Sequence, residues 1–125
     1  MLGKREPGIY GSQTFEEYLN ELRSQFPQVV FDYYQSNVEG ELINRLQASE
    51  ADGIIMNAGG YTHTSVAIAD AIAAISVPVI EVHISNVYAR EEYRHESKMA
   101  KNCKGVVAGF GMDSYRLAVL AYTSK

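Results

Sequence analysis

The chain has 125 residues, of which 46% are hydrophobic and 21% charged, and its formal net charge is −4. This length allows one domain with a single core, and the mildly acidic balance argues against a broad nucleic-acid-binding surface, which needs clustered positive charge. The single cysteine, Cys103, excludes an internal disulfide and a cysteine-rich metal site.

Membrane and export signals are also not expected. No apolar run approaches 18 residues, so we expect no membrane span. Residues 1–7 hold no apolar signal-peptide core. We therefore expect a cytoplasmic protein.

The first elements are a loop, a helix and a strand. Residues 3–12 are loop-like, with three glycines. Thr14 and Glu17 form the capping-box pattern T-x-x-E ahead of apolar residues at helical spacing, which predicts a helix over about 14–25. Residues 29–34 are rich in β-branched and aromatic side chains and predict a strand.

A second helix, a second strand and a third helix follow. Ser36 and Glu39 repeat the capping-box spacing. The apolar residues behind them return at helical intervals and are the predicted buried face: Val38, Leu42, Ile43 and Leu46. Residues 53–57 predict a short strand, and after two glycines either Thr64 or Ser65 is placed to cap the third helix.

The last elements complete an alternating pattern. Residues 79–84 predict a strand, 86–104 a loop with a short helix, 105–109 a strand and 113–123 a helix. Short strands separated by helices imply parallel pairing, so the sequence predicts an α/β fold with a doubly wound sheet. Ligands in such sheets bind beyond the carboxyl ends of the strands. The pattern begins with a helix, where this arrangement normally has a strand.

The strand predicted at 79–84 carries polar residues that a buried parallel strand should lack. Glu81, His83 and Ser85 are spaced by two and share one face. A carboxylate beside an imidazole fixes its tautomer and raises its basicity. An exposed edge strand would also explain the three residues, but their place at the carboxyl end favours a site.

Two further segments are weaker candidates. Asn57 ends a predicted strand, and His63 and Thr64 lie near the start of the next helix, whose free N–H groups suit an oxygen-rich ligand. Taken alone, these residues are better explained by a plain glycine turn with a helix cap.

Four basic or aromatic residues lie in predicted loops. Arg5 and Tyr10 stand between glycines, and Arg90 and Arg94 are four apart, so they share a face if the segment is helical. The alternatives are a solvated basic loop and a charged surface helix.

Sequence signatures of cofactor sites are missing. Gly109-Phe-Gly111 does not complete G-x-G-x-x-G, and the chain has no phosphate-binding G-x-x-x-x-G-K-S/T or nucleophile elbow G-x-S-x-G. His63, His83 and His95 lack metal-ligand spacing. An enzyme of this kind would use acid–base chemistry without a cofactor.

Taken together, these segments resemble the signature blocks of type II 3-dehydroquinate dehydratase. The similar blocks, in the order of that family, are residues 3–11, 35–40, 57–65, 81–86, 89–94 and 105–111. The resemblance covers essentially the whole chain. It implies a flavodoxin-like fold with three layers (α/β/α), the reversible conversion of 3-dehydroquinate to 3-dehydroshikimate and water, and no metal or organic cofactor. The family serves the shikimate pathway or quinate breakdown.

The resemblance also implies the catalytic roles. Tyr10 matches the base that takes a proton from the carbon next to the ketone. Arg5 matches the arginine that keeps this tyrosine anionic, and Arg90 matches a second arginine near it. His83, paired with Glu81, matches the acid that protonates the departing hydroxyl.

Substrate contacts are implied in the same way. Asn57 matches the residue that orients the departing hydroxyl. Ile84 and Ser85 match the backbone and hydroxyl donors that hold the substrate carboxylate. The remaining matches are His63 and Arg94, which contact ring hydroxyls.

The assembly implied by the family is a homo-oligomer, often a dodecamer of trimers. Asp70 matches an aspartate that reaches into a neighbouring subunit's site. No nucleic-acid or membrane partner is expected.

The start of the chain departs from the family pattern, which begins with a strand and the sequence N-G-P-N-L-N. Residues 1–3 stand where that segment would end, so we expect a single domain over 1–125 that lacks the first strand and its asparagine. An internal methionine taken as the start is the explanation we favour. A fragment and a true truncation are the alternatives.

Two other functions compete on the sequence, and the second is disfavoured. One is a non-catalytic flavodoxin-like subunit that binds a hydroxy-carboxylic acid, which the absent strand favours. The other is a phosphoryl-accepting receiver domain. A receiver domain would need clustered aspartates at strand ends, where this chain carries Asn57 and Ser85.

Overall fold

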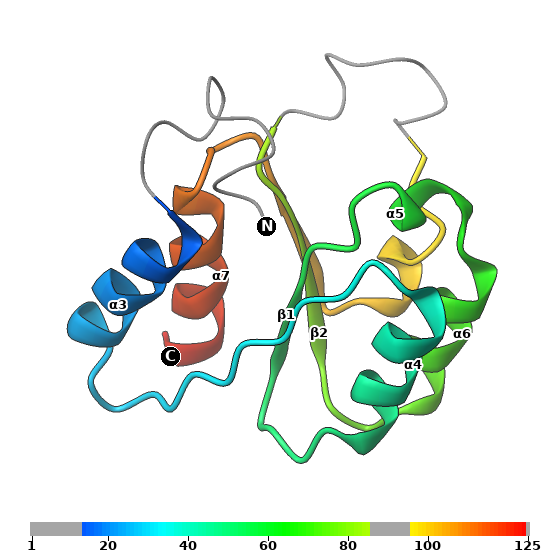
Figure 1. Cartoon of the computed structure of the whole chain (residues 1–125), viewed down its shortest axis with the longest axis horizontal. Coiled ribbons are helices and arrows are strands. Elements are labelled where there is room, and N and C mark those ends of the chain that lie inside the picture. Colours follow the sequence, from blue (N-terminus) through cyan, green and yellow to red (C-terminus); the bar gives the residue numbers. More distant parts are fainter. Residues whose placement is uncertain (1–13, 86–95, 125) are drawn as a thin grey trace. The chain divides into compact units, whose positions relative to one another are not determined.

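A computed structural model describes residues 14–85 and 96–124 of the chain. Contacts divide the chain into two compact units, Met1–Gln35 and Ser36–Lys125. The elements, labelled in Figure 1, are α3 (Phe15–Gln25), α4 (Glu39–Ala48), β1 (Ile54–Met56), α5 (Tyr61–Thr64), α6 (Val66–Ala74), β2 (Val79–His83), the 3-10 helix η3 (Ala100–Asn102), β3 (Gly105–Ala108) and α7 (Asp113–Thr123). Within the described residues, every predicted helix and strand except one is present at or near its expected place.

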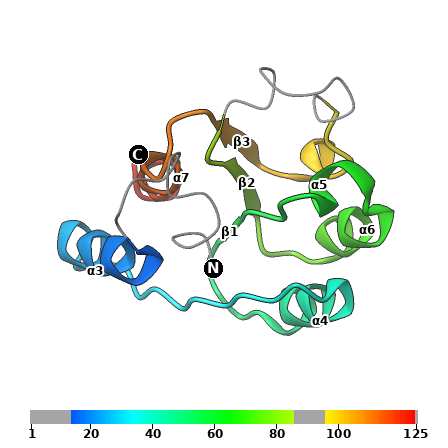
Figure 2. The same ribbon diagram turned by 45° about the horizontal axis from the view of Figure 1, so that its top comes forward.

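The second unit is built on a parallel sheet with the strand order β1-β2-β3. Ile54 pairs with Val79 across β1 and β2, and Ile80 pairs with Gly105 across β2 and β3. Figures 1 and 2 show α7 on one face of this sheet and α4 and α6 on the other. This arrangement confirms the predicted α/β fold with three layers.

Apolar side chains fill the space between the sheet and the helices α4 and α6. The buried cluster on this face consists of Leu46, Met56, Ala58, Ile68, Ala69, Ala71, Ile72, Val79 and Met99. Every residue of β2 is buried, because the strand has a neighbour on each side and helices over both faces. β2 therefore offers the most enclosed position in the sheet for a polar side chain.

In the first unit, helix α3 follows its sequence pattern. The Thr14 hydroxyl accepts a hydrogen bond from the Glu17 amide at 3.2 Å, which satisfies one of the free N–H groups of the first turn. The helix ends at Gln25, two residues before Pro27. Within the same unit, the ring of Phe15 stacks on Tyr33 with centroids 4.6 Å apart.

The strand predicted over 29–34 is wrong. These residues belong to no strand in the structure, and Val30 is 96% exposed. A strand exists only through a hydrogen-bonded neighbour, and no described segment forms a ladder with this one. The β-rich composition is a local preference that cannot supply that neighbour.

The predicted capping of α4 is also wrong. Val38 is the cap residue and half of it is exposed, so it does not join the buried face. The Ser36 hydroxyl accepts from the Val38 amide at 3.0 Å and donates to the Glu41 carboxylate at 2.8 Å. A serine–carboxylate pair does form here, but it joins Ser36 to Glu41 in the first turn of the helix instead of to Glu39.

The third predicted helix is divided in two. Ser65 ends α5 and caps α6, and its hydroxyl accepts from the Ile68 amide at 2.9 Å. Of the two predicted caps, Ser65 is therefore correct, and Thr64 belongs to α5. The division places His63 inside a short helix of its own.

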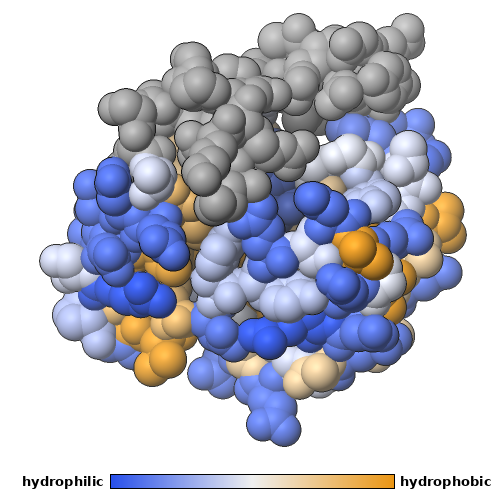
Figure 3. Space-filling view, viewed as in Figure 1, coloured by the Kyte–Doolittle hydropathy of each residue, from blue (hydrophilic) through white to orange (hydrophobic). Residues whose placement is uncertain are grey.

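The surface of the described residues is mostly polar in the view of Figure 3, with small apolar patches. None of the helices described over 14–85 and 96–124 combines the length and the hydropathy needed to cross a bilayer.

Candidate active site

Glu81 and His83 form a buried pair at the carboxyl end of the central strand. The two side chains leave β2 on the same face because they are two residues apart. His83 Nε2 lies 2.5 Å from Glu81 Oε2, and the exposed fractions of the two residues are 8% and 1%. A buried carboxylate is stable only with hydrogen-bonding partners, so this pair compensates both groups. The alternative of a solvated edge strand is wrong, since β2 is central.

The second oxygen of Glu81 is bound as well. The Ser97 hydroxyl donates to Glu81 Oε1 at 2.7 Å. The same hydroxyl oxygen accepts from the amides of Met99 at 3.2 Å and Ala100 at 3.1 Å. The sequence did not single out Ser97, because it lies 16 residues from Glu81 in a polar stretch with no regular spacing.

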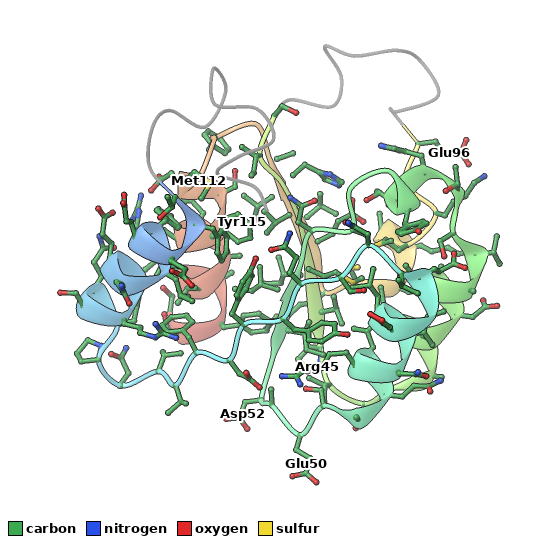
Figure 4. All side chains as sticks on the ribbon, viewed as in Figure 1. Arg45, Glu50, Asp52, Glu96, Met112 and Tyr115 are labelled. Atoms are coloured by element: carbon green, nitrogen blue, oxygen red, sulfur yellow. The ribbon has the colours of Figure 1, made fainter. Side chains whose placement is uncertain are left out.

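His63 of α5 lies beside His83. The two imidazole rings are nearly parallel, with centroids 6.3 Å apart and an angle of 20° between planes. His63 Nδ1 lies 2.7 Å from the carbonyl oxygen of Glu96, which can only accept, so Nδ1 carries the proton. Glu96 adjoins α5 in Figure 4. The structure thus brings together two predicted site residues from different elements.

Asn57 follows β1 and has a fixed amide group. Its Oδ1 accepts from the Gly59 amide at 3.0 Å, and its Nδ2 donates to the Tyr115 hydroxyl at 3.2 Å. Gly59 has φ +58°, a left-handed conformation that favours glycine. Tyr115 belongs to α7 (Figure 4) and is buried. The sequence analysis did not single out Tyr115, so this contact was missed.

The backbone after β2 is held by the turn that follows β3. The Gly109 amide donates to the carbonyl of His83 at 3.1 Å, and the Gly111 amide donates to that of Ile84 at 2.8 Å. Ile84 is buried, and Ser85 behind it is half-buried. These bonds fix the backbone at the predicted carboxylate-binding residues.

Of the other predicted residues, only Asp70 lies in the described part of the chain. Asp70 is exposed on α6, and in the described part of the chain no hydrogen bond joins it to Glu81 or His83. The remaining predictions lie outside the described residues: Arg5, Tyr10, Arg90 and Arg94.

Cys103 lies near the buried pair. Burial, with a smaller contribution from the charge of Glu81, raises the pKa of the Cys103 thiol to about 11. The thiol is therefore neutral near pH 7. Over residues 14–85 and 96–124, no three His, Cys, Asp or Glu side chains are grouped as metal ligands.

The sequence has clear relatives. A family model described as dehydroquinase class II matches residues 1–123. A 3-dehydroquinate dehydratase of Exiguobacterium sp. is 54% identical over 123 residues, which is 97% of this chain and 85% of the relative. The 3-dehydroquinate dehydratase of Pelodictyon phaeoclathratiforme is 48% identical over 124 residues, covering 96% and 82%.

Comparison with solved structures indicates the same family. The crystal structure of a type II dehydroquinase from Butyrivibrio crossotus superimposes with a TM-score of 0.90 and 41% identity. The match covers 98% of this chain and 89% of that one. The fold is accordingly flavodoxin-like, and the chain belongs to the dehydroquinase class II family.

Proposed function

We propose that this enzyme dehydrates 3-dehydroquinate to 3-dehydroshikimate, with the Glu81–His83 pair protonating the departing hydroxyl. The family membership makes the chain a 3-dehydroquinate dehydratase, a lyase of the shikimate pathway. The observation that carries the role of the pair is the buried hydrogen bond between Glu81 and His83 at the carboxyl end of β2. Ligands in parallel sheets bind beyond this end.

The geometry of the pair suits a general acid. Glu81 accepts the Nε2 proton of His83, so the carboxylate stabilises the imidazolium. The other ring nitrogen, Nδ1, is then the one that delivers a proton to the substrate. A positioned acid of this kind contributes about 10²–10⁴-fold to the rate.

The reaction also requires a base that removes a proton from the carbon next to the ketone. From the family resemblance we assign it to Tyr10, as a phenolate held by the guanidinium groups of Arg5 and Arg90. The electron pair of the broken C–H bond forms an enolate. It then expels the hydroxyl, which leaves as water with the proton from His83.

Substrate placement is assigned to five further residues. The Asn57 amide is held between Gly59 and Tyr115, which leaves one Nδ2 hydrogen to orient the departing hydroxyl. Ile84 and Ser85 would hold the substrate carboxylate. The residues assigned to ring hydroxyls are His63, whose ring is fixed through Nδ1, and Arg94.

We also propose a homo-oligomer of trimers that assemble into a dodecamer. Asp70 is exposed on α6, as a residue that completes a neighbour's site must be. Light scattering of the purified protein tests this assembly, and a monomer with full activity would contradict it.

An ultraviolet assay for the conjugated enone product tests the function. We expect Tyr10→Phe to abolish turnover without loss of fold, because phenylalanine cannot accept the proton. Tyr34→Phe makes the same change at an exposed tyrosine and serves as the matched control. Substantial residual activity of Tyr10→Phe would remove the base assignment. Wild-type protein that binds 3-dehydroquinate but forms no enone would instead identify a non-catalytic binding subunit.

A further inference from the structure

Ser97 uses its full hydrogen-bonding capacity around Glu81. A serine hydroxyl has one hydrogen to donate and two lone pairs that accept. The lone pairs receive the amides of Met99 and Ala100, so the single hydrogen points at Glu81 Oε1, 2.7 Å away. The direction of this donor is therefore set by the backbone that follows it.

The Glu81 carboxylate depends on few partners. It is almost fully buried, and in the described part of the chain its two oxygens are bound by one side chain each, His83 at Oε2 and Ser97 at Oε1. Removing one partner leaves a buried acceptor unsatisfied, which is costlier than the loss of a bond in water. Ser97 is thus the group that holds Glu81 from the side opposite His83.

We propose that Ser97 is a positioning residue that sets the orientation and charge of the Glu81–His83 pair. A carboxylate bound at both oxygens cannot rotate, so Oε2 stays directed at His83 Nε2. The neutral imidazole then carries its proton on Nε2. The proposal rests on the dehydratase function, because the orientation matters through the proton that His83 delivers.

The residues on either side of Ser97 give the same segment a second attachment. The Lys98 amide donates to the Thr62 carbonyl at 2.7 Å, and the Glu96 carbonyl accepts from His63 Nδ1 at 2.7 Å. Residues 96–98 therefore connect α5, with its imidazole, to the carboxylate of β2. A substitution of Ser97 therefore affects the site through the lost bond to Glu81. The loss of the bonds to Met99 and Ala100 would by itself affect only the structure of the turn.

The test compares three substitutions of Ser97 with one control. Ser97→Ala removes the donor, Ser97→Thr keeps it, and Ser97→Cys retains a weak donor of similar size. Ser65→Ala is the matched control, since Ser65 also accepts a backbone amide but lies outside the pair. Each variant is assayed for kcat and KM. The tautomer of His83 is followed by nitrogen-15 NMR of the histidine rings.

We expect Ser97→Ala to lower kcat about tenfold with KM within about twofold, the effect of losing one charge-assisted hydrogen bond. Its His83 ring should change from the Nε2–H tautomer to a mixture. Ser97→Thr should restore both readouts, and Ser97→Cys should fall between. Ser65→Ala should leave both unchanged even though it loses a helix cap.

Two results would overturn the proposal. One is an unchanged His83 tautomer and kcat in Ser97→Ala. The other is equal losses of kcat in Ser97→Ala and Ser65→Ala, which would make Ser97 a turn residue only. If Ser97→Ala does not fold, Ser97→Cys with wild-type values refutes the proposal by itself. An inactive wild-type protein would contradict the dehydratase function, whereas the NMR comparison still decides the role of Ser97.

Discussion

The two ends of the sheet both hold polar side chains, but these have different partners. At the carboxyl end, Glu81 and His83 bind each other. At the amino end, the Tyr122 hydroxyl of α7 lies 2.8 Å from the carbonyl oxygens of both Ile54 and Pro78, to which it donates. The polar groups at the carboxyl end are paired with each other's side chains, whereas the Tyr122 hydroxyl at the amino end is paired with the backbone.

The two ends therefore differ in what their polar groups do. The backbone carbonyls at the amino end use the only hydrogen of the Tyr122 hydroxyl, so that end joins α7 to the sheet. At the carboxyl end, His83 is bound to Glu81 through Nε2, and Nδ1 is the ring nitrogen that we assign to the substrate. The partners of a buried polar group, rather than its presence, therefore indicate whether it serves a reaction.

The largest effect is expected from Glu81→Gln at the carboxyl end. The amide has nearly the same shape but cannot stabilise an imidazolium, so kcat should fall by about 10²–10⁴-fold. Glu96→Gln is the control, because Glu96 is exposed and pairs with Lys98. The enone assay measures both variants. A Glu81→Gln enzyme with kcat close to wild type would show that the pair is structural.

Cys103, which interacts electrostatically with Glu81 of the carboxyl end and with Tyr122 of the amino end, tests how enclosed its own thiol is. With a thiol pKa of about 11, the thiolate fraction at pH 8 should be on the order of 100-fold below that of a free cysteine. Iodoacetamide should then react slowly with the folded protein and at the ordinary rate in urea. Equal rates in both states would contradict the assigned burial.

Gly53→Ala disturbs the amino end alone. A methyl group at Gly53 would stand 2.7 Å from Cε1 of Tyr122, so the ring must move. We expect a loss of about 2 kcal/mol in the free energy of unfolding, measured in urea, with kcat unchanged. Gly105→Ala is the control, because nothing lies within 4 Å of its added carbon. A fall in kcat would show that the two ends are coupled.

The smallest effect concerns the stability at high pH. Burial raises the pKa of Tyr122 to about 12, above the ordinary value of 10. Between pH 10 and 12 the unfolded chain loses this proton while the folded chain keeps it, so stability falls as pH rises. Because the ring is only half-buried, we expect a loss of about 1 kcal/mol. Thermal unfolding from pH 9 to 11.5 measures it, and Tyr122→Phe should flatten that part of the dependence.

Local patterns in the sequence predicted most of the fold. The capping box at Thr14 and the helical spacing after it define α3, and short apolar runs define the three strands. The segment 29–34 failed because a strand depends on a neighbour that its own composition does not encode. The cap at Ser36 failed because the helix begins at Glu39 with Val38 as its cap residue, and the Ser36 hydroxyl accepts the Val38 amide ahead of the helix.

The site was predicted where it depends on spacing along one strand. Glu81 and His83 were recognised because a period of two places them on one face. Ser97 and Tyr115 were missed because they reach Glu81 and Asn57 across 16 and 58 residues. Neither contact leaves a periodic trace in the sequence. The roles of the residues outside the described ranges remain predictions from the family.

The central place of β2 has a dynamic consequence. Its amides are hydrogen-bonded within a strand that has neighbours on both sides, so they should exchange with deuterated solvent only when the whole domain opens. The proposed proton donor thus sits on a strand that we expect to be rigid. Any movement that admits substrate or releases water must come from the segments that surround the strand.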